Sequence, residues 1–163
     1  MNGIGRLLMM LAIVALATGC SRHVMSEDAL SAVDLPDGYR QFIQDPPANI
    51  GKTVLLGGFI AENILTREGT TLKVKPYTLN RQGQPRRLIQ DGEEFLASTD
   101  RLLPPDRFSA GHMVTLTATY RGLESRAEEG RIYRRMLFEI GEIRSWPPPA
   151  HYPYGYYYPY RIY

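Results

Sequence analysis

Cys20 is the only cysteine of this 163-residue chain, and it stands shortly after an apolar N-terminal segment. Residues 7–16 are all Leu, Met, Ala, Ile or Val, and Arg6 places a positive charge before them. The run is shorter than the roughly 20 residues that an apolar helix needs to cross a bilayer, but it has the length of a signal-peptide core. A chain with one cysteine forms no intrachain disulfide and no cysteine-based metal site. Its fold must therefore rest on an apolar core alone.

The residues around Cys20 predict a covalent lipid anchor. The run Leu-Ala-Thr-Gly-Cys, residues 16–20, resembles the lipobox of bacterial lipoproteins. In such proteins the cysteine sulfur receives a diacylglycerol, cleavage here falls between Gly19 and Cys20, and a fatty acid such as palmitate acylates the new amine. Each buried methylene contributes about 0.8 kcal/mol, so two or more chains hold a protein stably on a membrane. Ser21 resembles the residue that outer-membrane lipoproteins of enteric-type bacteria carry after the cysteine. The alternative is the core helix of a cytosolic protein, which would show polar residues at helical spacing.

Residues 1–19, the predicted signal peptide, contain one arginine and no acidic residue. Without them, the 19 Lys and Arg residues of the chain become 18, against 17 Asp and Glu residues. A nearly neutral surface has no long-range attraction for nucleic acid, and export would remove that partner as well. We therefore expect no nucleic-acid partner.

Composition divides the rest of the chain into three parts. Residues 20–45 are mostly polar and predict a flexible lipidated tether, with a short helix near residues 26–30 and packing that begins at Tyr39, Phe42 and Ile43. Residues 46–146 predict one folded domain. Residues 147–163 begin with three prolines and hold seven of the eleven tyrosines. We expect this tail to be disordered and its tyrosine rings to bind a cell-wall or envelope-protein partner. The alternative is an extension that only keeps the protein soluble.

Alternation of apolar and polar residues predicts strands in the domain. A strand that starts at Thr53 is apolar on both faces, and Gly57 and Gly58 in its middle predict a bulge or sharp coil. Residues 112–121 alternate as a half-buried antiparallel strand does. Further strands are expected within residues 71–77, 93–99 and 132–146, with a bulge at Gly141, a polar loop at 80–87 and one helical turn at 100–110. The fold is predicted to be all-β, a small OB-like barrel of five to six strands, with a β-sandwich as the alternative.

Candidate catalytic residues are sparse. The histidines after residue 20 lie at no recognised spacing from a serine or an aspartate; they are His23, His112 and His151. Glutamates occur as the neighbours 93–94 and 128–129, but adjacent strand residues face opposite ways and do not form the pair that glycan cleavage needs. The sequence contains no phosphate loop and no metal-ligand spacing. We expect a non-catalytic protein without cofactor or metal; an enzyme whose site is not legible in the sequence is the alternative.

Two groups of arginines predict a basic patch. If both lie at one rim of the barrel, they bind phosphates of anionic lipid or lipopolysaccharide. The alternative is a charge-balanced surface, because glutamates occur close by at positions 124, 128 and 129. The candidate residues are Arg81, Arg86, Arg87, Arg131, Arg134 and Arg135.

Residues 47–60, Pro-Ala-Asn-Ile-Gly-Lys-Thr-Val-Leu-Leu-Gly-Gly-Phe-Ile, resemble the opening of the Slp family, the starvation-inducible outer membrane lipoproteins of Gram-negative bacteria. Similarity continues in residues 72–79, 95–97, 103–108 and 114–122 and ends at Trp146. Ile50 stands where the family usually has an aromatic residue, and the tail lies outside the recognised pattern. The resemblance implies a periplasm-facing outer-membrane lipoprotein linked to starvation or acid stress, with no catalytic residue carried over.

Overall fold

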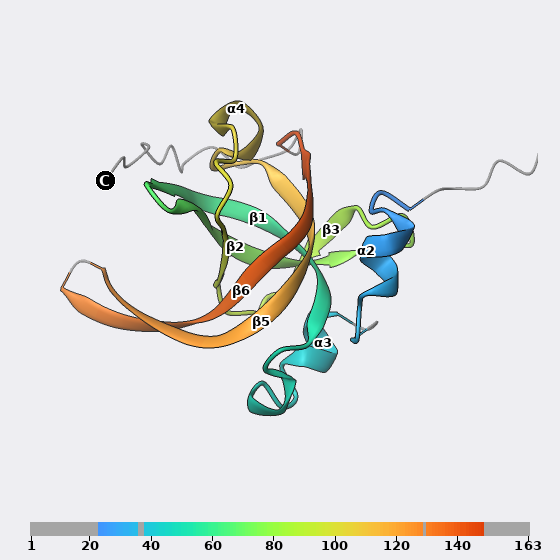
Figure 1. Ribbon diagram of the computed structural model, residues 1–163, viewed down its shortest axis with the longest axis horizontal. Coiled ribbons are helices and arrows are strands. Elements are labelled where there is room, and N and C mark those ends of the chain that lie inside the picture. The colour runs from blue at the N-terminus through green and yellow to red at the C-terminus, as the bar shows by residue number, and fades with distance from the viewer. Residues whose placement is uncertain (1–22, 36–37, 129, 149–163) are drawn as a thin grey trace, which may run out of the picture.

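The computed structural model describes residues 23–35, 38–128 and 130–148 (Figure 1). Its strands are β1 (Thr53–Thr66), β2 (Gly69–Leu79), β3 (Pro85–Leu88), β4 (Phe95–Thr99), β5 (Met113–Glu128) and β6 (Arg131–Trp146). Its short helices are α2 (Glu27–Ser31), α3 (Tyr39–Phe42) and α4 (Pro105–Phe108), with a 3-10 turn at Pro47–Asn49. Within these described ranges no helix has the length and apolar character needed to cross a membrane.

Five of the strands close into a ring. The order β1-β5-β6-β4-β2 is completed by pairing of β2 with β1, and β3 extends the sheet beyond β2. Neighbours are antiparallel except β4 and β6, which run parallel with Leu96 opposite Leu137. A closed ring of this size is a small barrel and not a sandwich of two sheets. The prediction of an all-β barrel with five to six strands is confirmed.

The length of β1 allows the ring to close. Its residues 53–59 pair with β5 and its residues 57–66 pair with β2, so the glycine pair has a neighbour on each side. A Cβ atom on Gly58 would lie 2.1 Å from Cγ1 of Val74 and 2.7 Å from the carbonyl oxygen of Lys75. Glycine is therefore required where the strands come closest. The bulge of β1 falls between Ile60 and Glu62, just after the predicted position.

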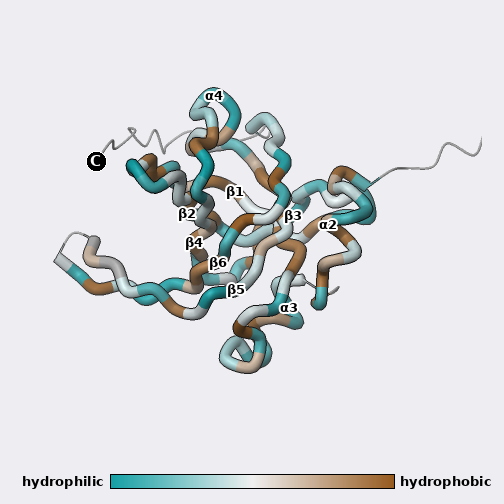
Figure 2. The backbone as a smooth tube through the Cα atoms, viewed as in Figure 1, coloured by the Kyte–Doolittle hydropathy of each residue, from teal (hydrophilic) through white to brown (hydrophobic). Residues whose placement is uncertain are grey.

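The core fills the interior of the barrel. Phe42, Phe95 and Phe138 are fully buried, and their rings lie edge-on or tilted with centroids 5.1–5.3 Å apart around Phe138. Tyr120 joins them at 4.7 Å from Phe42. Hydrophobic residues alternate with hydrophilic ones along the strands, as Figure 2 shows. Burial of these aromatic rings supplies the apolar stabilisation that a chain without disulfides needs.

Packing begins earlier in the chain than the predicted domain boundary at residue 46. Met25, Leu35 and Phe42 are buried, and Leu35 forms a parallel bridge with Val54 of β1. Phe42 was correctly expected to pack, whereas Ile43 is 44% exposed. The apolar residues of this segment are widely spaced and pack on distant strands, so they produce no local stripe. The predicted tether, residues 20–45, therefore contains residues that pack on the barrel, and its residues 20–22 lie outside the described part of the chain.

Other elements differ from the sequence-based expectation in extent. The helical turn expected within residues 100–110 is α4, and β6 has a bulge at Gly141, where two of its residues face Thr117. The expected polar loop at 80–87 contains part of β3, and β5 continues through Gly122 to Glu128. The predicted disorder of the tail concerns residues that, apart from 147 and 148, lie outside the described part of the chain.

Candidate functional site

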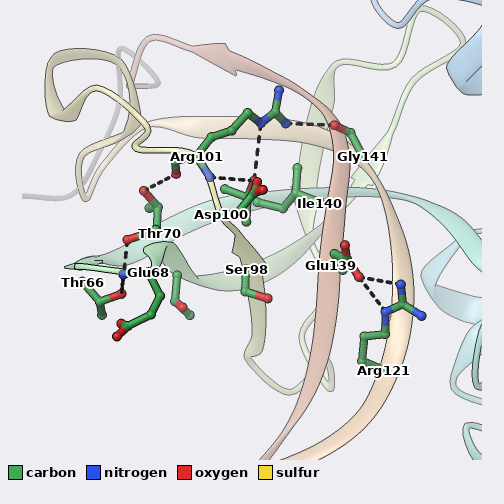
Figure 3. A pocket seen from close by; sticks show the side chains of 13 residues that line it. Thr66, Glu68, Thr70, Ser98, Asp100, Arg101, Arg121, Glu139, Ile140 and Gly141 are labelled. Atoms are coloured by element: carbon green, nitrogen blue, oxygen red, sulfur yellow. Dashed lines mark hydrogen bonds and ion pairs between the residues drawn. The ribbon is translucent and has the colours of Figure 1, made fainter.

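A cleft of about 540 Å³ lies on the outer face of the barrel, beside the β1–β2 turn (Figure 3). Its floor is a row of neighbouring residues on three strands, since Thr71 of β2 is opposite Ser98 of β4 and Ser98 is opposite Glu139 of β6. The residue next to each of these in sequence is buried in the core: Leu72, Ala97 and Phe138. Because strand side chains alternate, the row faces outward.

Hydroxyl groups fix the upper wall of the cleft. Thr70 Oγ1 donates to the carbonyl of Arg101 and accepts from the amide of Leu103, both at 2.9 Å. Thr99 Oγ1 accepts from the backbone amide of Arg101 at 3.3 Å and from its Nε at 3.4 Å. These bonds hold the connection from β4 to α4 against the start of β2. These hydrogen bonds therefore fix the position of the wall.

Charges of both signs border the row. Arg121 donates from Nε to Glu139 Oε2 at 2.7 Å, and a second bond from its Nη2 makes the pair two-pronged. Both side chains are about half exposed. Arg101 Nη2 donates to the carbonyl of Gly141 at 3.0 Å, and Glu68 and Asp100 add carboxylates to the lining. The cleft thus offers donors and acceptors without a large excess of one charge.

The ionisable groups with a shifted pKa lie elsewhere in the described residues. Burial raises the pKa of the Tyr39, Tyr77 and Tyr120 hydroxyls. A hydrogen bond from the Ser26 hydroxyl lowers the pKa of Glu142, with help from the Ser26 amide and Arg144. None of these four groups lines the cleft. In the described ranges, no three or more His, Cys, Asp or Glu residues lie together as a metal site would require.

The structure separates the two predicted arginine groups. Arg81, Arg86 and Arg87 belong to the β2–β3 turn and β3, on the right of Figure 1, whereas residues 131–135 lie in the protruding end of β6, on the left. The reason is that β5 and β6 continue beyond the ring as a two-stranded arm, residues 123–128 and 131–135. Arg135 lies 3.8 Å from Glu94 and 4.8 Å from the centre of the Tyr133 ring, with 11% of its side chain exposed. The six arginines form no common patch.

The described histidines and Glu94 have structural partners. His23 Nδ1 accepts from the amide of Met25 at 3.1 Å, and His112 Nδ1 lies 2.9 Å from Ser109 Oγ. Glu94 pairs with Lys75 at 3.7 Å as well as with Arg135. Gly19, Cys20 and His151 lie outside the described residues. The cleft itself was not predicted, because its threonines and serine come from distant strands and form no motif.

A family model described as the outer membrane lipoprotein Slp family matches residues 17–163. The match includes Cys20 and the residues just before it. It also includes the tyrosine-rich tail, so the expectation that the tail lies outside the family pattern is wrong. The chain has no significant match among curated proteins and none among solved structures.

Proposed function

Because the chain belongs to the outer membrane lipoprotein Slp family, we propose that it is a non-catalytic envelope protein that binds a polar ligand in the cleft of the barrel. In this proposal the chain is cleaved between Gly19 and Cys20, Cys20 carries the lipid, and the barrel faces the periplasm. The family match supports the anchor, because it spans the residues on both sides of that bond. A role under starvation or acid stress belongs to the same proposal and is supported by the family resemblance.

The position of the cleft carries the binding proposal. OB-type barrels bind oligosaccharides and oligonucleotides on an outer face flanked by the loop between the first two strands and the loop before the last strand. In this barrel the cleft is lined by residues of the β1–β2 turn and by Arg121 and Glu139, which stand at the base of the β5–β6 arm. The fold indicates where a ligand would bind but not which ligand.

The chemistry of the lining favours a glycan. Hydroxyls such as those of Thr71 and Ser98 both donate and accept hydrogen bonds, as sugar hydroxyls do. Arg121 is already paired with Glu139, so a polyanion would meet no free cation from this arginine. A periplasm-facing protein has the cell-wall glycan within reach. We therefore propose the glycan chain of peptidoglycan as the ligand of the cleft.

Binding of the full-length lipoprotein in detergent to purified peptidoglycan tests this proposal. Ser98→Tyr places a ring on the floor of the cleft and is expected to weaken binding by at least about tenfold, a cost of roughly 1.4 kcal/mol. Ser125→Tyr introduces the same ring on the exposed arm and is expected to bind as the wild type does. Equal binding by all three proteins, or no binding by the wild type, would refute the assignment.

The same incubation separates binding from catalysis. A binding protein returns the glycan with unchanged chain length, which chromatography of the recovered material measures. Shortened glycan would instead support the alternative, an envelope enzyme. Comparison of a deletion strain with its parent in acid and in starvation tests the proposed link to stress.

The tyrosine-rich tail is proposed as a second contact with a cell-wall or envelope-protein partner. Tyrosine rings stack on sugar faces, cations and other rings at low cost in rotamer entropy. Truncation after Trp146 is expected to weaken association with peptidoglycan or co-purified proteins and to leave the melting temperature unchanged. A clearly lower melting temperature would show that the tail belongs to the folded unit.

A further inference from the structure

The first described residues of the chain are packed on the β2–β3 hairpin. The amide of Val24 donates to the carbonyl of Gln82 at 3.0 Å. The His23 ring lies against Gly83 so closely that a Cβ on this glycine would be 2.5 Å from His23 Cε1. Met25 is 3% exposed. The hairpin therefore holds the chain at a defined place on the barrel.

A second set of contacts fixes the same segment. Ser26 Oγ caps α2 by accepting from the amide of Ala29 at 3.1 Å, and it donates to Glu142 Oε2 of β6 at 2.5 Å. The Ser26 amide also donates to the Glu142 carboxylate at 3.3 Å. With contacts to both the hairpin and β6, residues 23–31 cannot swing as a loose linker.

The distance from this packed segment to the lipid-bearing residue is short. Three residues of fully extended chain span at most about 11 Å, so the Cα of Cys20 lies within that distance of the Cα of His23. From this limit we infer that the β2–β3 hairpin is the membrane-facing surface of the protein and binds anionic phospholipid headgroups. The inference rests on lipidation of Cys20 but not on the ligand of the cleft.

The charge of the hairpin matches this partner. Residues 80–90 include Arg81, Arg86 and Arg87 and no acidic residue, and all three arginines are exposed. Guanidinium groups bind phosphate oxygens with two parallel hydrogen bonds. Glu27 and Asp28 in the first turn of α2 are also exposed and would be repelled by an anionic surface. The hairpin, rather than α2, is thus the contact.

This orientation places the cleft and the arm away from the membrane. In Figure 1, β3 and α2 lie on one side of the barrel and the β5–β6 arm lies on the other. The two arginine groups therefore have different surroundings: the hairpin arginines face the bilayer, and the exposed Arg131 and Arg134 of the arm face the periplasm.

Fluorescence quenching in reconstituted vesicles tests the inference. Full-length protein, shown by its mass to carry lipid on Cys20, is incorporated into vesicles of phosphatidylcholine and phosphatidylglycerol with a headgroup spin label. A fluorophore is attached at Leu88→Cys in β3 or at Ala127→Cys in the arm; the acylated Cys20 sulfur does not react. Strong quenching is expected at position 88 and little at position 127. Equal quenching at both positions, or stronger quenching at 127, would overturn the orientation.

Paired arginine substitutions test the lipid partner. Each arginine near an anionic surface strengthens contact with that surface about fivefold. R86Q combined with R87Q is therefore expected to lower the equilibrium constant for headgroup contact about 25-fold. R131Q combined with R134Q removes the same charge from the arm and is expected to leave quenching at position 88 unchanged. Quenching at 88 that survives R86Q/R87Q, or that is equally strong in pure phosphatidylcholine, would overturn the assignment of anionic lipid.

Discussion

At the scale of single residues, the sharpest steric demand lies at the glycine pair of β1. A Cβ on Gly57 would meet the end of the flexible Leu79 side chain at 2.3 Å, which can move. A Cβ on Gly58 would meet both Val74 and the backbone carbonyl of Lys75. Backbone atoms in a closed barrel move only if neighbouring strands move with them. Gly58 is thus the less replaceable of the two.

Gly58→Ala is expected to lower the free energy of unfolding by about 3 kcal/mol, the upper end of the cost of overpacking a core. Denaturant unfolding of the two proteins measures the difference. Gly141→Ala is the matched control, because its added methyl would approach the nearest atom, Thr117 Oγ1, only to 3.1 Å. A loss at Gly58 no larger than that at Gly141 would contradict the steric argument.

Glu142 is the residue that couples the N-terminal segment to pH. The Ser26 hydrogen bond lowers its pKa from the usual 4.5, so the folded state binds this proton less readily than the unfolded state. Its stabilisation is therefore present above pH 4.5 and is lost as the pH falls through the lowered value.

Glu142→Gln is expected to cost about 1 kcal/mol at neutral pH, because a charged acceptor becomes a neutral one at a partly exposed site. The difference from the wild type should shrink as the pH falls below 4 to 5, as unfolding at several pH values would show. Glu139→Gln on the same strand breaks an exposed pair and is expected to cost less, with Arg121 free to bind water. A cost for Glu142→Gln that does not change with pH would argue against an ionic role.

At the scale of elements, prediction from the sequence succeeded where local pattern decides structure. The alternation in residues 112–121 predicted β5, because burial on one face imposes period two. The apolar run with the glycine pair predicted β1. It failed for β3, whose four residues are half-buried or exposed and gain their strand form by pairing with β2. Phe42 was expected to pack, but the aromatic rings that it contacts were not predicted, since they are far away in sequence.

The candidate site was less predictable than the fold. Thr71, Ser98 and Glu139 are ordinary outward residues of three strands, and only closure of the ring brings them together. The sequence identifies the two groups of arginines but not where each group lies in the fold. They are far apart because β5 continues through Gly122 and forms the arm with β6. The alternation that predicts a strand ends at residue 121, whereas cross-strand pairing continues the strand to Glu128.

The outer part of the β5–β6 arm is expected to be the least stable strand pair. Its residues pair only with each other, since pairing of β5 with β1 ends at Thr119 and pairing of β6 with β4 begins at Leu137. Isolated two-stranded ribbons are marginal in water. Hydrogen-exchange measurements should show amides of residues 123–128 exchanging at least about 100-fold faster than those of residues 54–60, a difference of roughly 2.7 kcal/mol in opening free energy. Similar protection would imply a partner for the arm.

At the scale of the whole molecule, we propose that the barrel has two functional sides. The side of the β2–β3 hairpin holds the N-terminal segment and, in our proposal, the membrane. In the same proposal the cleft and the arm occupy other faces, where a ligand in the periplasm can reach them. Such a division depends on the short distance between Cys20 and the packed residues, because a long tether would allow every orientation.

The central claim is that this barrel is held at the outer membrane by lipid on Cys20, and the intact mass of the protein purified from outer-membrane fractions tests it most directly. We expect a chain that begins at residue 20 and exceeds its polypeptide mass by a diacylglyceryl group and an amide-linked fatty acid. Cys20→Ser should abolish both the cleavage and the added mass. A wild-type protein that retains residues 1–19, or that carries no lipid after cleavage, would contradict the claim.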